Sequence, residues 1–600
     1  MPNEPVIYTA QAFNDIPPVQ NASAADFIFS SPFAPLNDTV AFTDAVTGVK
    51  LTRKEVYDFS LRLAWKVEGM GLVHRKKSVA MIFSPNSISW PITFFGLQTA
   101  GIIATLANSA YTPAELAHQL RDSGARVVFV HPLLLPTLME TWKLLGVSEK
   151  DAKWRTVLMS WTEQDERDEA TVGVQGSKEW KRLKDLVKGS GKKQGPIELS
   201  GSQTDATALM CYSSGTTGLS KGVETTHRNI VTLLQIYWPF RPKFDINKDV
   251  EMGLLPLYHI FGIIKLLCLS MWAGLPVVLI PKFEPVLFFK TVETYKISLV
   301  KLVPPVLVHL ATHPAFEQHD LKSLWHLFSG AAPLGEGLVR RVKARFEKVH
   351  GTKPYIVQGY GLTEMSPTTH MLPDADDMRK VGSIGLLLPT LECRLIDEDG
   401  NDVEKGSGKP GELWMRGKSV MKGYMNNPVA TANTITKDGW FKSGDVAVRD
   451  DEGYFYIVDR KKELIKYKGF QVPPADLEAV LLTNEKVADA GVIGIESQEQ
   501  ATELPRAYVV PTDSALLPSA NPPPSPAAVR AYEEEVAEWI KTKVAKHKYL
   551  RGGVKVVDII PKSGAGKILR RELREMAKAE AKQDLEKSLR ANGAKIEAKL

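Results

Sequence analysis

The sequence predicts an α/β protein with a large N-terminal domain, a β-rich part within that domain, and a small α+β C-terminal domain. Residues 40–145 alternate short apolar runs with helical patterns, which is typical of α/β units around a largely parallel sheet. Beyond residue 380, short strand patterns separated by Asp-Gly and Glu-Gly turns indicate a β-rich part. From about residue 460, charged helical patterns surround one strand pattern at Ala490–Ile495. The predicted units are therefore 1–459 with its β-rich part at 380–459, 460–575, and a charged helical tail at 576–600.

The elements of the large domain follow from apolar runs bounded by polar turns. In residues 40–145 the pattern predicts strands at Ser78–Phe83 and Val127–Val130 and an apolar helix at Trp90–Ala100. Residues 161–200 are charged and rich in glycine and lysine, so we expect a mobile surface excursion there. The later predicted elements are a helix that begins within Glu224–Leu234 and the strands Ala206–Tyr212, Val277–Ile280, Leu299–Val303 and Leu324–Ser329.

Size, charge and cysteine content narrow the class of protein. A chain of 600 residues needs roughly two to four structural units, because one core does not extend over that length. A net charge of +6 is small for this length and gives no support for nucleic-acid binding. Cys211, Cys268 and Cys393 are far apart in apolar segments, which indicates a reducing compartment and no zinc site. Met1–Val19 does not resemble a secretory signal, and the apolar run Leu266–Ile280 is too short to span a membrane.

The loop Ser213–Gly222 carries the most informative pattern in the chain. Its glycines let the backbone approach a ligand closely, and its N–H groups, hydroxyls and Lys221 can converge on an anion. The spacing differs from the common P-loop, in which a serine or threonine follows the lysine. Such a composition is also typical of a plain surface turn. A strand before the loop and a helix after it would favour a grip on triphosphate.

Other segments carry residues suited to a nucleotide reaction. In Gln358–Glu364 an aromatic ring can stack on a base, a threonine can bond a phosphoryl oxygen, and Glu364 can hold Mg²⁺. In Ser443–Asp445 a carboxylate suits ribose hydroxyls, and Arg460 suits the adjacent phosphate. Lys567 ends a Gly-rich loop and is mobile enough to be delivered to a site. Taken singly, any one of these lysines or aspartates is equally typical of solvated surface.

As an ordered set, the segments resemble a known superfamily. The motifs that carry this resemblance are, in chain order, SSGTTGLSKGV, SGAAPLG, QGYGLTE, GELWMRG, SGD, DRKKELIKYKGFQV and PKSGAGKILRREL. The chain resembles the adenylate-forming enzymes, and within them it looks like the 4-coumarate–CoA ligase branch. The resemblance covers about residues 30–575, and it departs at Ser220, where the branch usually has proline. It implies a large domain of stacked α/β sheets and a small, mobile C-terminal domain.

The resemblance implies a two-step reaction with ATP, Mg²⁺ and coenzyme A. A carboxylate attacks the α-phosphorus of ATP to give acyl-AMP and pyrophosphate, and the thiol of coenzyme A then attacks the acyl carbon and expels AMP. Because two anions must meet in the first step, the site needs cations and oriented amides. By family position, Glu364 carries Mg²⁺, and the nucleotide is bound by Ser213, Ser214, Gly215, Thr216, Thr217, Gly218, Lys221, Ala331, Gln358, Gly359, Tyr360, Thr363, Asp445, Arg460 and Lys567.

The second step requires a different set of residues. Family members rotate the C-terminal domain about a hinge near Asp459–Lys461, and the rotation exchanges Lys567 for the face Glu463–Gln471. Contacts to coenzyme A are implied for Lys282, Lys468 and Gly469, although Lys282 can equally be a plain strand end. The implied catalytic residues of the two steps are Lys567, His259, Thr363, Lys466 and Gln471.

The acid-binding segment departs from the hydroxycinnamate ligases. Those ligases usually carry tyrosine and serine at the positions of Phe261 and Lys265, and some carry lysine at Phe328. Because the usual partners of a ring hydroxyl are missing, we expect an aryl, phenylpropanoid-like or medium-chain acid rather than coumarate in particular. The implied lining of the slot, behind the gate residue His259, is Phe261, Lys265, Phe328, Gly361, Pro367 and Thr368.

Lys265 has two interpretations. It lies four residues after Phe261 and therefore on the same helical face. In the first interpretation its side chain snorkels to water. In the second it pairs with a polar or anionic tail on the substrate.

The last three residues, Ala598-Lys599-Leu600, resemble the peroxisomal address that an import receptor reads. They follow a charged helical pattern at Arg570–Ala591, which would expose them. We therefore expect a peroxisomal protein, with the cytoplasm as the alternative.

Two other functional classes share some of these features. A luciferase-like oxygenase would use the same fold and Lys567, but its His-His-Gly-Phe segment is replaced here by Tyr258–Phe261. A non-catalytic or carrier-loading module is disfavoured because Lys567 and Glu364 are intact and no carrier domain is expected after residue 575.

Overall fold

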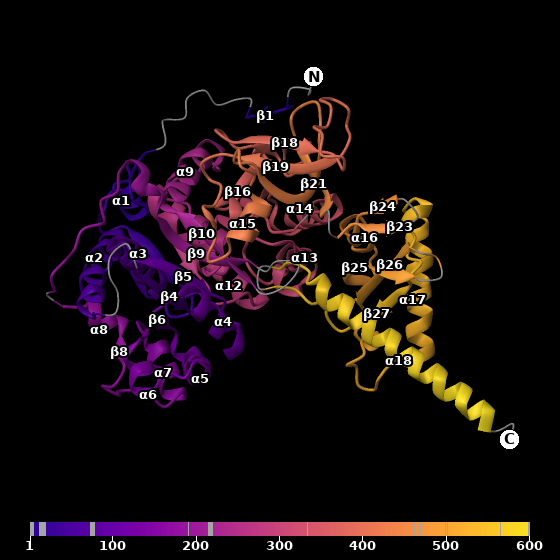
Figure 1. Ribbon diagram of the computed structural model, residues 1–600, viewed down its shortest axis with the longest axis horizontal. Helices are drawn as coiled ribbons and strands as arrows, with labels where there is room; N and C mark the ends of the chain where they lie inside the picture. The colour runs from indigo at the N-terminus through magenta and orange to yellow at the C-terminus, as the bar shows by residue number, and fades with distance from the viewer. Residues whose placement is uncertain are drawn as a thin grey trace.

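The computed structural model describes residues 5–10, 20–71, 78–189, 191–213, 220–332, 334–460, 463–467, 470–497, 500, 502–563 and 566–597. At 459–460, 470–471 and 584–597 it describes the backbone alone. Figure 1 shows a large part, coloured indigo to orange, and a smaller orange-to-yellow part beside it that ends in the long helix α18 (Arg570–Glu597). None of the described helices combines the length and apolarity needed to cross a bilayer.

Two large sheets form the N-terminal part. The first has the order β20-β10-β9-β5-β4-β6-β7-β8 and is parallel from β9 to β8. Its strands are β4 (Val79–Phe83), β5 (Ile103–Ala107), β6 (Val127–Val130), β7 (Thr156–Leu158), β8 (Lys181–Arg182), β9 (Thr207–Ser213), β10 (Lys221–Thr226) and β20 (Gly423–Tyr424).

The second sheet has the order β17-β16-β15-β14-β13-β11-β12-β2-β3 and is parallel from β15 to β2. Its strands are β2 (Val40–Asp44), β3 (Lys50–Thr52), β11 (Glu251–Gly253), β12 (Val277–Leu279), β13 (Leu299–Leu302), β14 (His326–Ser329), β15 (Tyr355–Gly361), β16 (Thr368–Met371) and β17 (Leu386–Leu387).

Apolar helices fill the space between the two sheets. All twelve residues of α3 (Ser89–Ala100) are buried, so other parts of the protein cover this mainly apolar helix on every face. It shares one hydrophobic core with side chains of β4 and β12, which come from different sheets. The helices of this layer are α1 (Ala24–Phe29), α3, α9 (His227–Tyr237), α10 (Ile260–Gly262) and α11 (Leu269–Ala273), with a π-helical stretch at Ile263–Cys268 between the last two.

The outer helices begin and end at residues of the expected types. In α4 (Pro113–Ser123), Thr112 and Glu115 form a capping box, and Gly124 ends the helix in the left-handed conformation. The other outer helices are α2 (Arg53–Gly69), α5 (Leu135–Leu144), α6 (Glu149–Trp154), α7 (Glu163–Thr171), α8 (Leu183–Val187), α12 (Pro285–Tyr295), α13 (Pro304–Thr312), α14 (Glu336–His350) and α15 (Pro428–Thr434).

The β-rich part is an antiparallel sheet in the order β1-β18-β19-β21-β22. Turns at Gly400, Gly439 and Gly453, all at positive φ, connect or flank its strands as predicted. The strands are β1 (Tyr8–Thr9), β18 (Glu392–Ile396), β19 (Gly411–Arg416), β21 (Phe441–Arg449) and β22 (Phe455–Arg460).

The C-terminal part contains more strands than the one that the sequence predicts. The predicted strand Ala490–Ile495 is the middle of β25 (Val487–Ser497), which pairs with β26. The prediction of a single strand is wrong because β26 mixes charged and apolar residues and gains its order from pairing along most of β25. The other elements are β23 (Ile465–Tyr467), β24 (Phe470–Val472), β26 (Thr502–Pro511), β27 (Val554–Val556), α16 (Pro474–Leu481) and α17 (Pro526–Lys541).

A buried ion triad joins three segments of this C-terminal part. The guanidinium of Arg570, at the start of α18, lies 2.6 Å from Glu463 Oε2 and 2.7 Å from Glu478 Oε2. All three side chains are buried. Burial raises the pKa of Glu478, and the nearby Arg570 opposes that rise. The triad therefore ties the segment after β22 to α16 and to the helix that follows Lys567.

The prediction of a mobile excursion at 161–200 is wrong for much of that segment. Helix α7 and edge strand β8 lie within it, and β8 pairs in parallel with β7. Arg182 Nη2 lies 2.7 Å from the buried Glu169 Oε2. The charges that suggested mobility thus neutralise one another inside the fold.

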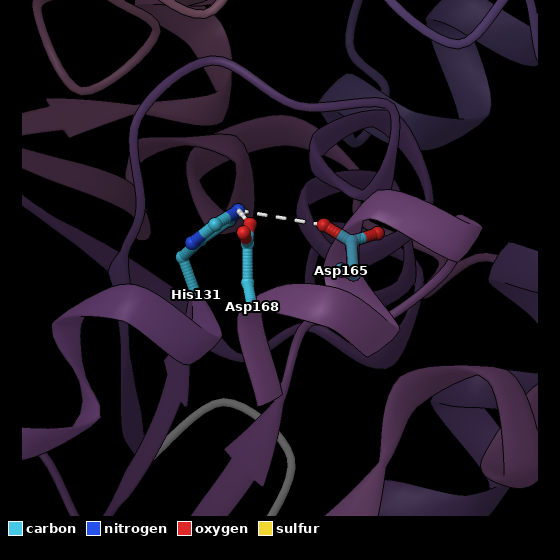
Figure 2. A group of neighbouring side chains, drawn as sticks. All are labelled: His131, Asp165 and Asp168. Atoms are coloured by element: carbon cyan, nitrogen blue, oxygen red, sulfur yellow. Dashed lines mark ion pairs between the residues drawn. The ribbon is translucent and has the colours of Figure 1, made fainter. Parts of the chain in front are cut away.

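Figure 2 shows a second contact that holds α7 in place. Nε2 of His131 lies 3.4 Å from Asp165 Oδ1 and 3.8 Å from Asp168 Oδ2. Burial raises the pKa of Asp165, but bonds from His131 and the N–H of Thr162 outweigh it and leave the pKa below its usual value. Because Nδ1 of His131 accepts the N–H of Leu133, the neutral ring carries its proton on Nε2 and offers no lone pair there. We therefore interpret this group as a structural contact rather than a metal site.

Candidate active site

Several described residues of the predicted nucleotide-binding set lie where the two large sheets meet. Strand β9 ends at Ser213, and β15 ends at Gly361, just before the 3₁₀ turn Thr363–Met365. Ser213 Oγ donates a hydrogen bond to Glu364 Oε1 at 3.2 Å, which joins the carboxyl ends of strands from both sheets. The carboxyl ends of parallel strands are where α/β proteins bind ligands.

Tyr424 is a member of this group that the sequence analysis missed. Its hydroxyl donates to Glu364 Oε1 at 3.0 Å, and Nζ of Lys221 lies 4.9 Å from the centre of its ring. Burial, together with the Glu364 carboxylate, raises the pKa of Tyr424, which therefore stays protonated at neutral pH. Sixty residues separate Tyr424 from Glu364, and the pairing of β20 with β10 brings them together along with a hydrogen bond from the Met421 N–H to the Glu364 carbonyl. No local pattern in the sequence signals this contact.

The prediction that a helix directly follows the glycine-rich loop is wrong. The segment after the loop is strand β10, which runs antiparallel to β9 with Lys221 opposite Ser213. The helix begins only at His227, capped by Thr226. The loop therefore connects two strands, so that a helix N-terminus does not contribute to anion binding there. Ser214, Gly215, Thr216, Thr217 and Gly218 lie outside the described residues.

The predicted adenylate residues form a compact wall. The hydroxyl of Tyr360 donates to Asp445 Oδ2 at 2.5 Å, and Asp445 is buried. Gln358 lies beside Ser329 in the parallel register of β15 and β14. A Cβ on Gly359 would lie 2.5 Å from Phe328 Cζ and 3.0 Å from the His370 carbonyl oxygen, so a larger residue here would force the ring to move. The other two predicted adenylate-binding residues lie in adjoining turns. Ala331 has a φ of 70°, and Thr363 lies in the 3₁₀ turn after β15.

The loop that carries Lys567 rests against the large part of the chain. A Cβ on Gly566 would lie 3.0 Å from Val303 Cγ2, at the carboxyl end of β13. Ser563 Oγ accepts the N–H of Lys567, and Ser563 donates its own N–H to the Lys567 carbonyl. These bonds fix the turn, and its position beside the end of β13 places Lys567 on the side of the molecule where β14 ends at Ser329.

The residues predicted for the second step are exposed and away from the Ser213–Glu364 contact, or they lie outside the described residues. Lys466 is exposed. Its backbone N–H donates a hydrogen bond to Glu503 Oε2, which helps to hold strand β23 in place. It lies opposite Gln471 in the β23–β24 hairpin, where the Gln471 side chain is not described. Lys282 is exposed after β12. Lys468 and Gly469 are not described, and Arg460 is placed only by its backbone, opposite Asp445.

The predicted acid-binding residues form two adjoining groups. The rings of Phe261 and Phe328 meet edge to face, 5.9 Å apart, and Phe261 also touches Gly330. Gly361 pairs with Thr368 next to Pro367 at the β15–β16 turn. The aromatic pair gives the slot an apolar wall.

His259 caps the helix that carries Phe261. Its Nδ1 accepts the N–H of Phe261 at 3.3 Å. Burial lowers the pKa of His259 to about 4, so that the ring is neutral at pH 7. A neutral ring with Nδ1 occupied presents its other nitrogen as a hydrogen-bond donor. Its predicted role as the gate residue stays a prediction.

The first interpretation of Lys265, a side chain that snorkels to water, is wrong. The residue is 1% exposed, and its Nζ lies over the ring of Tyr237. Helix α9 and strands of the second sheet cover the face that periodicity alone would leave open to water. The second interpretation, a contact with the substrate, is taken up below.

Comparison with known proteins identifies the family. The profile of the AMP-binding enzyme matches residues 34–425, and that of the AMP-binding enzyme C-terminal domain matches residues 476–567. The chain belongs to the AMP-binding enzyme family. The resemblance drawn from the sequence motifs is thereby confirmed.

Members of this family that resemble the chain cover nearly its full length. It is 35% identical to a 4-coumarate–CoA ligase-like protein 4 of Oryza sativa subsp. japonica, over 90% of both chains. It is 36% identical to a probable 4-coumarate–CoA ligase 1 of Dictyostelium discoideum, over 90% of this chain and 92% of that one. The structure of an anthranilate–CoA ligase in complex with anthranoyl-AMP superimposes with a TM-score of 0.78 at 22% identity, covering 94% of this chain and 98% of that chain. This likeness confirms the predicted fold class.

Proposed function

We propose that this member of the AMP-binding family is an ATP-dependent acid–CoA ligase that passes through acyl-AMP and takes a mainly apolar carboxylic acid. The observation that carries the proposal is the convergence at one sheet edge of the Ser213–Glu364 contact, the Tyr360–Asp445 contact and the loop of Lys567. The relatives that cover the chain are named as CoA ligases, which supports the same reaction class.

The residues present divide the first step between them. Asp445 offers a buried carboxylate to the ribose hydroxyls, and Tyr360 exchanges its present bond to Asp445 for a place beside the adenine. Lys221 faces the phosphates from β10. Lys567 neutralises charge where the acid carboxylate meets the α-phosphate. One carboxylate oxygen forms the new bond to phosphorus, and pyrophosphate leaves with the electron pair of the broken bond.

The chemistry at Glu364 fits Mg²⁺. The ion prefers oxygen ligands, and here a carboxylate stands between the hydroxyls of Ser213 and Tyr424. When bound, Mg²⁺ would neutralise phosphate charge. Ser213 and Tyr424 both donate to Oε1 of Glu364, so that Oε2 would be the oxygen to bind the ion.

For the second step we propose the same residues that the family resemblance implies. The C-terminal part would rotate so that Lys466 and Gln471 replace Lys567 at the site. Exposed Lys282 would then face the phosphates of coenzyme A together with Lys468 and Gly469. The thiol attacks the acyl carbon, and AMP leaves with the oxygen that came from the acid.

The proposal is tested by measuring pyrophosphate, AMP and thioester with a panel of cinnamates, benzoates, phenylacetate, fatty acids and dicarboxylates. Acid-dependent pyrophosphate release together with a thioester is the expected result. Pyrophosphate without thioester, whatever the acid, would contradict CoA ligation and point to an enzyme that uses the adenylate otherwise, as a luciferase does.

Replacing Tyr424 by phenylalanine is expected to raise the Mg²⁺ concentration needed for half-maximal activity by about 10-fold or more. The change removes one hydrogen bond to an ionised carboxylate, which is worth about 1.5–3 kcal/mol. A Mg²⁺ titration of initial rates at saturating ATP measures the shift. Tyr355→Phe, at the exposed start of β15, is the matched control and should leave the titration unchanged. An unchanged Mg²⁺ dependence in Tyr424→Phe would refute the positioning role.

Peroxisomal import through Ala598-Lys599-Leu600 is a further proposal. These residues lie outside the described part of the chain, and the proposal rests on their chemical pattern alone. A fluorescent protein fused in front of the last helix should enter peroxisomes, and the same fusion without the three residues should stay in the cytoplasm. Equal distribution of the two fusions would disprove the address.

A further inference from the structure

Lys265 is a buried amine that the proposed mechanism does not use. Its Nζ has no hydrogen-bond partner among the described residues and lies 2.9 Å from the centre of the Tyr237 ring. Burial lowers the pKa of Lys265 well below its usual value, and the positive charge of Lys301 adds to the effect. Leaving such a donor without a partner costs about 1–3 kcal/mol. An apolar residue at this position would remove that cost, so the amine needs another reason to be there.

The charged groups around Lys265 are unequal in number. Lys301 on β13 forms a buried ion pair with Glu251 on β11, and Glu251 also accepts a hydrogen bond from Ser270 Oγ at 2.9 Å. Glu251 is therefore already engaged by two donors. If Lys265 were protonated, the cluster would hold two positive charges and one negative charge. A second anion would complete it.

One strand pair and one helix link the cluster to the apolar wall of the acid slot. Lys301 is the register partner of Phe328 in the parallel pair β13–β14, so their side chains point to the same face of the sheet. Lys265 follows Phe261 by one helical turn on the helix that covers that face. Lys301 therefore lies beside Phe328 at the same level of the sheet, and Lys265 lies one turn beyond Phe261.

Space adjoins the cluster on its far side. A pocket there is lined in part by Tyr237, Glu251, Ser270 and Lys301, with Arg241 also in its wall. The groups around Lys265 thus border a cavity rather than solid packing.

We propose that Lys265 and Lys301 form the far end of the acid-binding slot and bind a second carboxylate, so that the substrate is an acid with an anionic group at the end of an apolar body. This inference rests on the proposed function, because it names the class of acid for the same slot. The body of the substrate packs against the Phe261–Phe328 pair. Its far carboxylate accepts hydrogen bonds from Nζ of Lys265.

Matched pairs of acids test the inference. Linear acids of equal length, one plain and one with a terminal carboxylate, are compared by kcat/KM for pyrophosphate release. The wild-type enzyme should prefer the dicarboxylate by about 10-fold or more, since a hydrogen bond to a charged group is worth about 1.5–3 kcal/mol. Lys265→Met should abolish that preference, so that the two acids of a pair are used with equal kcat/KM. Lys290→Met, an exposed lysine on α12, is the matched control and should keep the wild-type preference.

Proton uptake gives a readout that a merely structural role would not move. The groups facing Lys265 are Lys301, Glu251 and Tyr237, and a bound carboxylate would raise the pKa of the amine. Calorimetry in two buffers of different ionisation enthalpy should show proton uptake when the dicarboxylate binds to wild type, and none with Lys265→Met. Thermal unfolding of the variant should occur no lower than that of wild type, because the change removes an unpartnered amine.

The outcomes separate this inference from the proposed function. No pyrophosphate release with any acid would refute the ligase proposal itself. Efficient use of plain acids, with an equal or lower kcat/KM for dicarboxylates, would overturn only the inference. A preference for an acid with a terminal hydroxyl over one with a terminal carboxylate would also overturn it, because the site would then not be selecting an anion.

Discussion

Replacing Lys567 by alanine is expected to slow acyl-AMP formation by about 10²–10³-fold, the effect of removing one preorganised donor from a developing charge. The reason is its place in the fold. Gly566 packs against Val303 at the end of β13, so the lysine follows at the edge where the predicted adenylate residues lie. The two anions of the first step, the acid and the α-phosphate, would then meet without a cation between them.

The effect should be confined to the first step. Rapid-quench measurement of pyrophosphate reports acyl-AMP formation, and chemically prepared acyl-AMP with coenzyme A reports the second step alone. We expect the second step to stay within about twofold of wild type, since the rotated enzyme would use Lys466 and Gln471 instead. Lys562→Ala is the matched control. Lys562 lies on the same loop as Lys567, but its Nζ pairs with Asp489 of β25 at 2.6 Å. Equal loss in both half-reactions would contradict the division of labour.

Replacing Arg570 by methionine is expected to lower the unfolding free energy of the C-terminal part by about 3–5 kcal/mol, the usual effect of breaking a buried ion pair. Glu463 and Glu478 would keep their buried carboxylates and lose the guanidinium that both contact. Urea unfolding followed by hydrogen exchange in β25 and β26 measures the loss. Lys548→Met, whose partner Asp476 is half exposed, should cost at most about 1 kcal/mol.

The same variant should show a defined pH dependence. In the folded protein burial raises the pKa of Glu478, and Arg570 opposes the rise, so that removing Arg570 raises the pKa further. An acid whose folded pKa lies above its unfolded value binds more protons when folded, and stability therefore increases as pH falls. The loss caused by Arg570→Met should shrink from pH 7 toward pH 5. A deficit that stays constant, or that grows on acidification, would show that the carboxylates are not the cause.

The sequence was sufficient to predict those helices and strands whose local residue pattern agrees with their environment in the fold. Val127–Val130 is wholly apolar, Ser89–Ala100 is mostly apolar, and both are buried throughout, so the strand and the helix were predicted within one residue of their bounds. Strand β10 was missed because Lys221–Thr226 is polar and becomes a strand only between β9 and β20. Pairing between distant segments outweighs local propensity there.

The candidate site divides in the same way. Glu364, Tyr360 and Asp445 were found because ordered motifs carry them, and the structure brings Tyr360 and Asp445 into contact. Tyr424 was missed because its contact depends on register across sixty residues. The burial of Lys265 was missed because helical periodicity gives the spacing of a face but not what covers it, here Tyr237 and the Glu251–Lys301 pair.

The most direct test of the central claim follows the oxygen of the acid. If acyl-AMP is the intermediate, an acid with both carboxyl oxygens labelled with ¹⁸O transfers one of them to phosphorus, and that oxygen leaves with AMP when coenzyme A attacks. Mass spectrometry of the products should find one label in AMP, one in the thioester and none in pyrophosphate. Unlabelled AMP, or label in inorganic phosphate alongside ADP, would contradict the adenylate route for this enzyme.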